Sequence, residues 1–249
     1  MLINQTTLIS FWHATNRWLL DTLFPVRCLG CEKKGAWICD RCSLRIPRHL
    51  EQHCPECFRH ITPSGEVCFS CRDTAAPDLD GIFSASPYRD PLVSRAIHTF
   101  KYRFIPDLAP PLADILRSAL EKSLIPLPDA LIAVPLHPRR LRFRGFNQSE
   151  LLAHALSQTL TPGLELPLLT NTLVRIRFTR PQMKTDSREE RLTNLKNAFA
   201  ITKGKESMIH GKSLWLIDDV TTTGTTLKEC AAVLKRNGAK SVFGIVLAG

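Results

Sequence analysis

Two adjacent carboxylates stand at the end of an apolar run in the C-terminal part of this 249-residue chain. Residues 214–217 have the length and composition of a buried strand, and Asp218 and Asp219 follow directly. Paired carboxylates at the end of a strand can accept hydrogen bonds from vicinal sugar hydroxyls or hold a hard cation such as Mg²⁺. This stretch is therefore a candidate for binding a sugar, a metal ion or both.

A hydroxyl-rich turn comes next, and the apolar spacing of residues 227–236 then predicts a helix. A helix start presents unpaired N–H groups and the positive end of the helix dipole, which suits a phosphate. Gly224 lets the backbone approach a ligand closely or adopt a positive φ. The residues of the turn after Val220 are Thr221, Thr222, Thr223, Gly224, Thr225 and Thr226. Carboxylates beside such a phosphate cradle favour a sugar phosphate as ligand.

A second strand-and-loop segment is strongly basic. Residues 130–134 form an apolar run that predicts a buried parallel strand, a loop over 136–148 follows, and 149–160 read as a helix. A loop at the carboxyl end of a parallel strand faces the ligand crevice of an open α/β sheet, where arginines bind phosphate oxygens bidentately. The arginines are Arg139, Arg140, Arg142 and Arg144. A solvent-exposed basic loop is the alternative interpretation.

Eight cysteines form four CxxC pairs within residues 26–72, and two such pairs complete a tetrahedral thiolate site of the kind zinc prefers. The pairs are Cys28/Cys31, Cys39/Cys42, Cys54/Cys57 and Cys68/Cys71. Sequential pairing into two sites is the most economical, and interleaved pairing stays open. Iron–sulfur ligation and redox disulfides are the chemical alternatives. His53 and His60 lie nearby, and we expect them on the solvated surface because four thiolates already fill each site.

The composition favours anionic partners. The formal net charge is +10, and 44% of the residues are hydrophobic, which is enough for a folded core. No apolar run reaches the roughly 18 residues of a membrane-spanning helix, and we recognise no secretory signal, so metal binding explains the cysteines better than secreted disulfides. Residues 1–25 predict an amphipathic helix that either docks on a membrane or partner or packs against the protein itself.

The remaining chain alternates apolar strands with amphipathic helices, which predicts an α/β fold with a parallel sheet flanked by helices. Further strands are expected over 81–88, 173–176, 198–201 and 241–248, and further helices over 91–104, 108–124 and 188–197. The basic stretch 177–191 is typical of an active-site flap, although a merely flexible loop fits as well. The expected divisions are an N-terminal helix over 1–25, a double zinc ribbon over 26–75 and the α/β domain over 76–249.

The two acids and the Thr/Gly turn look like the 5-phosphoribosyl-1-pyrophosphate (PRPP) loop of type I phosphoribosyltransferases. The order of motifs along the chain narrows the resemblance to the ComF/GntX family, a bacterial group of double zinc-ribbon proteins with a phosphoribosyltransferase domain. These motifs are the four CxxC pairs, Lys101-Tyr102, Val134-Pro135, residues 144–148, Pro181-Gln182 with Arg191 and Asn194, and Ile217-Asp218-Asp219 with the threonine turn. The match covers nearly the whole chain, and the N-terminal helix carries less of it.

The resemblance implies roles for individual residues. Asp218 and Asp219 would meet the ribose hydroxyls, residues 220–226 would wrap the 5-phosphate, and Arg139 and Arg140 would contact the pyrophosphate. The implied catalytic residues are Asp218, Asp219, Arg144 and Lys101, and the implied flap residues are Gln182 and Arg191. The implied cofactors are two structural Zn²⁺ ions, held by the eight cysteines, and Mg²⁺ bound with PRPP.

The resemblance also implies a cytoplasmic protein for DNA uptake or utilisation in natural transformation. Its implied partners are PRPP, single-stranded DNA, and other DNA-uptake proteins such as a helicase or a DNA-processing factor. Two activities stay open at this point. The domain would either transfer phosphoribosyl groups from PRPP with release of pyrophosphate, or serve without catalysis as a single-stranded-DNA-binding or PRPP-sensing module. The acceptor substrate is not indicated by any motif.

Overall fold

A computed structural model describes residues 25–48, 51–63, 65–73, 77–123, 125–178 and 197–249. The chain divides into two compact units, Met1–Arg45 and Ile46–Gly249. The third and fourth CxxC pairs belong to the larger of these units, and the expected boundaries at residues 25 and 75 remain predictions. The helix expected over residues 1–25 lies outside the described residues, apart from its last position.

The smaller unit is built on its two CxxC turns. The backbone N–H of Cys28 donates to the carbonyl of Lys33, and an isolated antiparallel bridge joins Arg27 to Lys34. Helix α2 (Asp40–Ser43) is a single turn that begins next to Cys39. Few apolar side chains are buried among the described residues of this unit, so a metal ion held by the cysteines would supply much of its stability.

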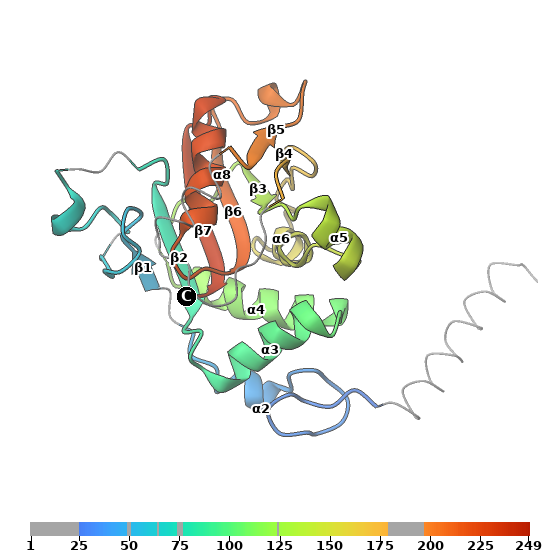
Figure 1. Ribbon diagram of the computed structural model, residues 1–249. Coiled ribbons are helices and arrows are strands. Elements are labelled where there is room, and N and C mark those ends of the chain that lie inside the picture. Colours follow the sequence, from blue (N-terminus) through green and yellow to red (C-terminus); the bar gives the residue numbers. More distant parts are fainter. Residues whose placement is uncertain (1–24, 49–50, 64, 74–76, 124, 179–196) are drawn as a thin grey trace, which may run out of the picture. The chain divides into compact units, whose positions relative to one another are not determined.

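The larger unit contains a five-stranded sheet in the order β1-β2-β7-β6-β3 (Figure 1). Its strands are β1 (Glu51–His53), β2 (Gly81–Ser86), β7 (Ser241–Ala248), β6 (Ser213–Val220) and β3 (Ala130–Ala133). β1 pairs antiparallel with β2, and the other three pairings are parallel. The carboxyl ends of β2, β7, β6 and β3 therefore meet at one edge of the sheet, where open α/β sheets bind ligands.

Helices cover both faces of this sheet, which confirms the predicted α/β fold with a parallel sheet flanked by helices (Figure 1). α4 and α6 pack together and against the sheet, and α8 packs on β6 and β7. The helices are α3 (Pro91–Tyr102), α4 (Ala109–Leu120), α5 (Pro138–Arg144), α6 (Gln148–Thr159) and α8 (Thr225–Arg236). Short 3₁₀ turns are η1 (Phe69–Cys71), η2 (Pro106–Leu108) and η3 (Glu206–Met208).

Two of the predicted strands lie outside the main sheet. β4 (Leu173–Arg175) and β5 (Phe199–Ile201) pair antiparallel and form a small sheet of their own. Its inner side chains, Leu173 and Phe199, are buried in the same core as Leu216 of β6 and Cys230 of α8. The small sheet is therefore anchored on the α8 side of the main sheet. Cys230 is fully buried there.

Candidate functional site

The paired carboxylates lie at the carboxyl end of β6, where each accepts hydrogen bonds. Asp218 Oδ1 accepts from Ser149 Oγ at 2.8 Å and from the backbone N–H of Asp219 at 2.9 Å. Asp219 Oδ1 accepts from the backbone N–H of Val220 at 2.7 Å and forms an ion pair with Lys101 Nζ at 2.9 Å. α3 supplies the lysine and α6 supplies the serine, so the site is assembled from three elements of one unit.

The surroundings shift the pKa values of Asp218 and Lys101. Burial and the charge of Asp219 raise the pKa of Asp218 to about 7, against the opposing influence of Lys101 and Ser149. Burial disfavours the charge on Lys101, but Asp219 and Asp218 outweigh it and raise the pKa of this ammonium. The group thus carries one firm positive charge and a carboxyl that can gain or lose a proton near neutrality.

The threonine turn leads into the N-terminus of α8, as the sequence predicted. Gly224 precedes the helix with a φ of +68°, and its N–H donates to Thr221 Oγ1 at 3.1 Å. Thr223 Oγ1 and Thr225 Oγ1 are 2.9 Å apart. These bonds fix the turn ahead of a helix whose first N–H groups have no partner within the helix, so an anion is the matching ligand.

The arginine segment that was expected to be a loop is a short helix, α5. Pro138 occupies its first turn, His137 Nδ1 accepts from the N–H of Arg139 at 3.2 Å, and Gly145 ends the helix with a φ of +78°. The loop prediction was wrong: a proline in the first turn, a capping histidine and a terminal glycine are signals of a short helix in this segment.

The helix divides the arginines between different surroundings. Arg140 and Arg144 line the cleft at the end of β6, whereas Arg139 and Arg142 are not among its lining residues. The guanidinium of Arg139 lies 5.2 Å from the ring centre of Phe178. Arg144 Nη1 donates to Gln148 Oε1 at 3.0 Å, and its guanidinium lies 5.6 Å from the ring centre of Tyr102. Arg140 and Arg144 are four residues apart and therefore lie on the same face of α5, the face that lines the cleft.

These groups meet in a cleft of about 760 Å³ at the carboxyl edge of the sheet. This volume falls within the roughly 300–1,000 Å³ usual for small-molecule sites. Of the residues predicted to bind or transform a ligand, the lining contains Lys101, Arg140, Arg144, Asp218, Asp219, Val220 and Thr226. Thr221 and Thr225 are buried beneath the surface of the turn. Gln182 and Arg191, the expected flap residues, lie outside the described residues.

Sequence reasoning missed other residues that line the same cleft, chiefly Ser149 and Arg175. Arg175 ends β4, is buried, and stacks its guanidinium 5.4 Å from the ring centre of Phe199. Burial and the nearby Arg140 lower the pKa of Arg175. A charged residue inside an otherwise apolar strand was the signal that would have pointed to it. Nothing in the sequence places Ser149 beside Asp218, because only the packing of α6 against β6 brings them together.

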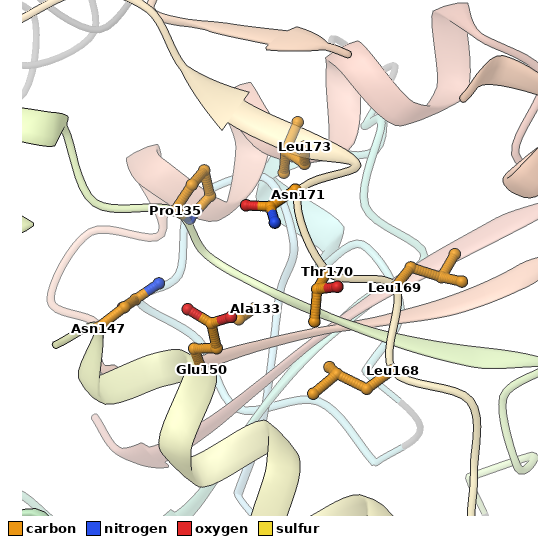
Figure 2. Close-up of a pocket in the computed structure, with 9 residues that line it drawn as sticks. All are labelled: Ala133, Pro135, Asn147, Glu150, Leu168, Leu169, Thr170, Asn171 and Leu173. Carbon is orange, nitrogen blue, oxygen red and sulfur yellow. The ribbon is translucent and has the colours of Figure 1, made fainter. Parts of the chain in front are cut away.

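A smaller pocket of about 50 Å³ lies beside β3 and borders the cleft through Pro135 (Figure 2). Figure 2 shows the carboxylate of Glu150 and the amide of Asn171 on opposite sides of it. Asn147 Nδ2 donates to the carbonyl of Val134 at 3.1 Å, which ties the pocket wall to the end of β3. Its size suits a few water molecules better than a sugar phosphate.

The eight paired cysteines fall into two groups of four, Cys28/Cys31/Cys39/Cys42 and Cys54/Cys57/Cys68/Cys71. Within each group the sulfurs lie within 4.8 Å of one another, so either group could hold a metal ion. The grouping is the sequential one. Cys31 Sγ and Cys39 Sγ are 3.6 Å apart, and Cys57 Sγ and Cys68 Sγ are 3.8 Å apart. A tetrahedral Zn²⁺ with Zn–S bonds of about 2.3 Å requires sulfurs about 3.8 Å apart, so both groups fit that ion.

Backbone donors favour the thiolate at one cysteine of each group. Burial raises the pKa of Cys57, but the N–H groups of Arg59 and His60 and the His60 side chain outweigh it, and the pKa falls to about 6. The pKa of Cys28 is likewise lowered to about 6 by backbone N–H groups, despite burial. In the same groups, a hydrogen bond with Cys31 and burial raise the pKa of Cys42 to about 12, and burial and a hydrogen bond with Cys68 raise the pKa of Cys71 to about 12. A lowered pKa favours the thiolate, which is the form that ligates metals.

The two histidines near the second group are not both solvated, contrary to expectation. His53 is buried, with its ring centre 4.4 Å from that of Phe58, because it faces the core from β1. His60 is exposed, but its Nδ1 lies 3.4 Å from the sulfurs of both Cys57 and Cys68. His60 is therefore placed to donate a hydrogen bond to the thiolates.

Among the described residues, no helix has the length and apolar character needed to cross a membrane.

Comparison with known proteins gives relatives that span most of the chain. No protein-family model matches it. The chain is 36% identical over 213 residues to the DNA utilization protein YhgH of Escherichia coli (strain K12), covering 84% of this chain and 88% of that protein. It is 32% identical over 221 residues to competence protein F of Haemophilus influenzae, covering 86% of each. A solved structure of glutamine PRPP amidotransferase from B. subtilis aligns with 60% of this chain and 30% of its own, at a TM-score of 0.39 and 15% identity.

Proposed function

Because the chain belongs to the ComF/GntX family of competence protein F and YhgH, we propose that it serves DNA uptake or utilisation in the cytoplasm and that its α/β unit binds Mg²⁺-PRPP. The family predicted from the motifs is confirmed by these relatives. The names of these relatives support the biological role, and the cleft at the carboxyl edge of the sheet supports the ligand.

One observation carries the PRPP proposal: two adjacent carboxylates (Asp219 buried, Asp218 partly buried), the start of a helix and several basic side chains converge on one cleft. Asp218 and Asp219 are suited to the ribose hydroxyls, and the turn before α8 is suited to the 5-phosphate. Arg140 and Arg144 line the same cleft and offer the positive charge that a pyrophosphate needs. A sugar carrying phosphate at both ends matches this distribution of charge.

A phosphoribosyl transfer would use the same groups. A nucleophilic nitrogen of the acceptor forms a bond to ribose C1, and the C1–oxygen bond breaks with its electron pair leaving on pyrophosphate. Lys101, Arg140 and Arg144 would stabilise the negative charge that develops on the leaving group. The carboxylate pair offers the oxygen ligands that Mg²⁺ prefers, and bound Mg²⁺ would neutralise phosphate charge. PRPP sensing without transfer would use the same binding groups.

Single-stranded DNA is the proposed macromolecular partner. Phe143 of α5 is strongly exposed, and its ring packs edge-on against that of the partly exposed Phe104, with centres 5.8 Å apart. Arg142 and Arg144 flank Phe143 on the same short helix. Exposed aromatic rings among arginines suit bases that stack and phosphates that need countercharge.

The first test is calorimetric titration of the metal-loaded protein with Mg²⁺-PRPP. The double variant Asp218→Asn/Asp219→Asn should lose PRPP binding while keeping its zinc content, because it removes the carboxylates and leaves the cysteines intact. The matched control, Asp78→Asn/Glu206→Gln, removes two negative charges from exposed side chains that do not line the cleft. Equal PRPP affinity in the carboxylate variant and the control would refute the proposed site.

The second test is the same calorimetric titration with oligothymidine in place of PRPP. Binding should weaken steeply as salt rises, because DNA binding releases counterions from the phosphates. Phe143→Ala should weaken binding without changing the salt dependence, since stacking is lost and no charge is removed. DNA binding that is insensitive to Phe143→Ala would argue against this surface.

A further inference from the structure

The two cysteine groups contain the same turn, but its final position holds very different residues. The carbonyl of Cys28 accepts from the N–H of Glu32 at 2.8 Å, and that of Cys54 accepts from the N–H of Phe58 at 2.9 Å. Glu32 and Phe58 have φ values of +63° and +58°. A bulky aromatic side chain in this left-handed region is unusual and strained. Glu32 is exposed and Phe58 is buried, so at the second turn the strained position supports a packing contact.

That contact is with the turn that we propose binds phosphate. Phe58 belongs to the buried cluster that contains Ile82 of β2 and Leu227 of α8. A Cβ placed on Gly224 would lie 3.7 Å from both Cβ and Cδ2 of Phe58 and 3.1 Å from Cδ1 of Ile82. The backbone of Gly224, which itself has a positive φ, therefore packs directly on the aromatic residue. The positive φ and the 3.1 Å approach to Ile82 favour glycine at this position, whereas the 3.7 Å spacing to Phe58 is an ordinary packing distance.

A second contact ties the same cysteine turn to the start of α8. Lys228 Nζ lies 3.0 Å from Glu56 Oε1, and it also donates to the backbone carbonyl of Glu56. Glu56 stands between Cys54 and Cys57, and Lys228 lies one helical turn after Gly224. The N–H of Lys228 donates to the carbonyl of Gly224 at 2.9 Å. Glu56 and Phe58 thus hold the turn before α8 from two sides.

We propose that the metal site formed by Cys54, Cys57, Cys68 and Cys71 fixes the shape of the 221–226 turn through Phe58 and Glu56, which act as positioning residues for its anionic ligand. This inference rests on the proposed phosphate-binding role of the turn. A metal ion holds the four sulfurs together and so enforces the turn from Cys54 to Phe58. Without the ion, no bond links the four sulfurs, so the turn from Cys54 to Phe58 is no longer enforced and Phe58 is freed from its strained conformation. The turn before α8 then loses the surface on which Gly224 rests.

The test compares variants of the metal-loaded full chain. Phe58→Ala removes the packing surface, whereas Phe58→Leu keeps much of the apolar contact. Glu56→Gln/Lys228→Gln removes the ion pair and leaves every cysteine in place, so it remains informative if Phe58→Ala fails to fold. Lys235→Gln is the matched control, because Lys235 forms an ion pair with Asp80 at 2.8 Å from the opposite end of α8.

Two readouts distinguish this inference from the proposed function. Amide hydrogen exchange of residues 221–226 reports the order of the turn with no ligand present, and calorimetry reports the Kd for Mg²⁺-PRPP. Phe58→Ala and the Glu56/Lys228 variant should speed exchange in the turn, as should chelation of the metal from the unmodified protein. If the competent turn falls to about a tenth of its population, the apparent Kd rises about tenfold. Phe58→Leu should fall between Phe58→Ala and the unmodified protein, and Lys235→Gln should change neither readout.

Unchanged exchange in the turn after chelation and in both variants would overturn the coupling, whatever the PRPP affinity. Exchange that responds in a protein that binds no PRPP would support the coupling and refute the proposed ligand. An equal effect from Lys235→Gln would show a general loosening of α8, and the coupling through the cysteine turn would then be wrong.

Discussion

At the scale of single residues, the site is defined by two adjacent acids, and among the described residues Lys101 is the lysine within hydrogen-bonding distance of one of them. Lys101 contacts Asp219 directly, while Asp218 relies on the hydroxyl of Ser149 and a backbone N–H. Two carboxylates close together beside one ammonium lower the stability of the ligand-free protein. Sugar hydroxyls or a cation bound there would compensate the excess negative charge. Two variants test this balance.

Asp218→Asn should stabilise the ligand-free protein above neutral pH. The folded pKa of about 7 is raised above the unfolded value of about 3.9. The protonated form therefore contributes stability that is complete below about pH 4 and is lost as pH rises through about 7. The variant should exceed the unmodified protein by roughly 1–3 kcal/mol in free energy of unfolding at pH 8, with the difference shrinking at pH 5. Urea denaturation at both pH values measures it, and a difference independent of pH would contradict the assignment.

Lys101→Met should destabilise the protein by about 1–3 kcal/mol, because the buried carboxylate of Asp219 loses its countercharge. The double variant Lys101→Met/Asp219→Asn should recover part of that loss, since no unpaired charge then remains. A double-mutant cycle from urea denaturation gives the coupling energy between the two side chains. Strict additivity would show that the 2.9 Å ion pair does not contribute to stability.

At the scale of elements, sequence patterns located most strands and helices because their apolar spacing is local information. The run before Asp218 became β6, and the spacing after Gly224 became α8. The arginine segment was wrongly predicted to be a loop. Its high charge is typical of a loop, but the proline at its start and the glycine at its end indicate a helix. The contacts of Ser149 and Arg175 depend on packing between segments far apart in the chain, which no local pattern encodes.

Gly224→Ala tests the turn between β6 and α8. The residue has a φ of +68°, and an added Cβ would lie 3.1 Å from Ile82 Cδ1. We expect a loss of more than about 1 kcal/mol in free energy of unfolding, together with weaker PRPP binding. Gly163→Ala is the matched control, with a φ of +77° and nothing within 4 Å of the added Cβ. It should show only the backbone penalty and bind PRPP normally. Equal effects of the two variants would mean that the packing around Gly224 is unimportant.

At the scale of the whole molecule, the sequence revealed four CxxC pairs but not how they divide between the two compact units. One cysteine group lies in Met1–Arg45 and the other in Ile46–Gly249. The expected double zinc ribbon treated both groups as one module. Phe58 and Ile82 lie in one buried cluster, so the second group shares its buried neighbours with the main sheet.

The whole chain should therefore bind two zinc ions that differ in their effect on the larger unit. Cys31→Ser and Cys57→Ser each remove one thiolate from a group of four, so each should lower the zinc content from two ions per chain to about one. Cys57→Ser should also lower the melting temperature of the sheet-containing unit, because its group packs into that unit's core through Phe58. Elemental analysis counts the metal, and calorimetric melting follows the unit. If both variants kept two zinc ions, thiolate ligation by these residues would be wrong. If Cys57→Ser lost its zinc with an unchanged melting transition, the metal would be an accessory to the larger unit and not part of what holds its fold.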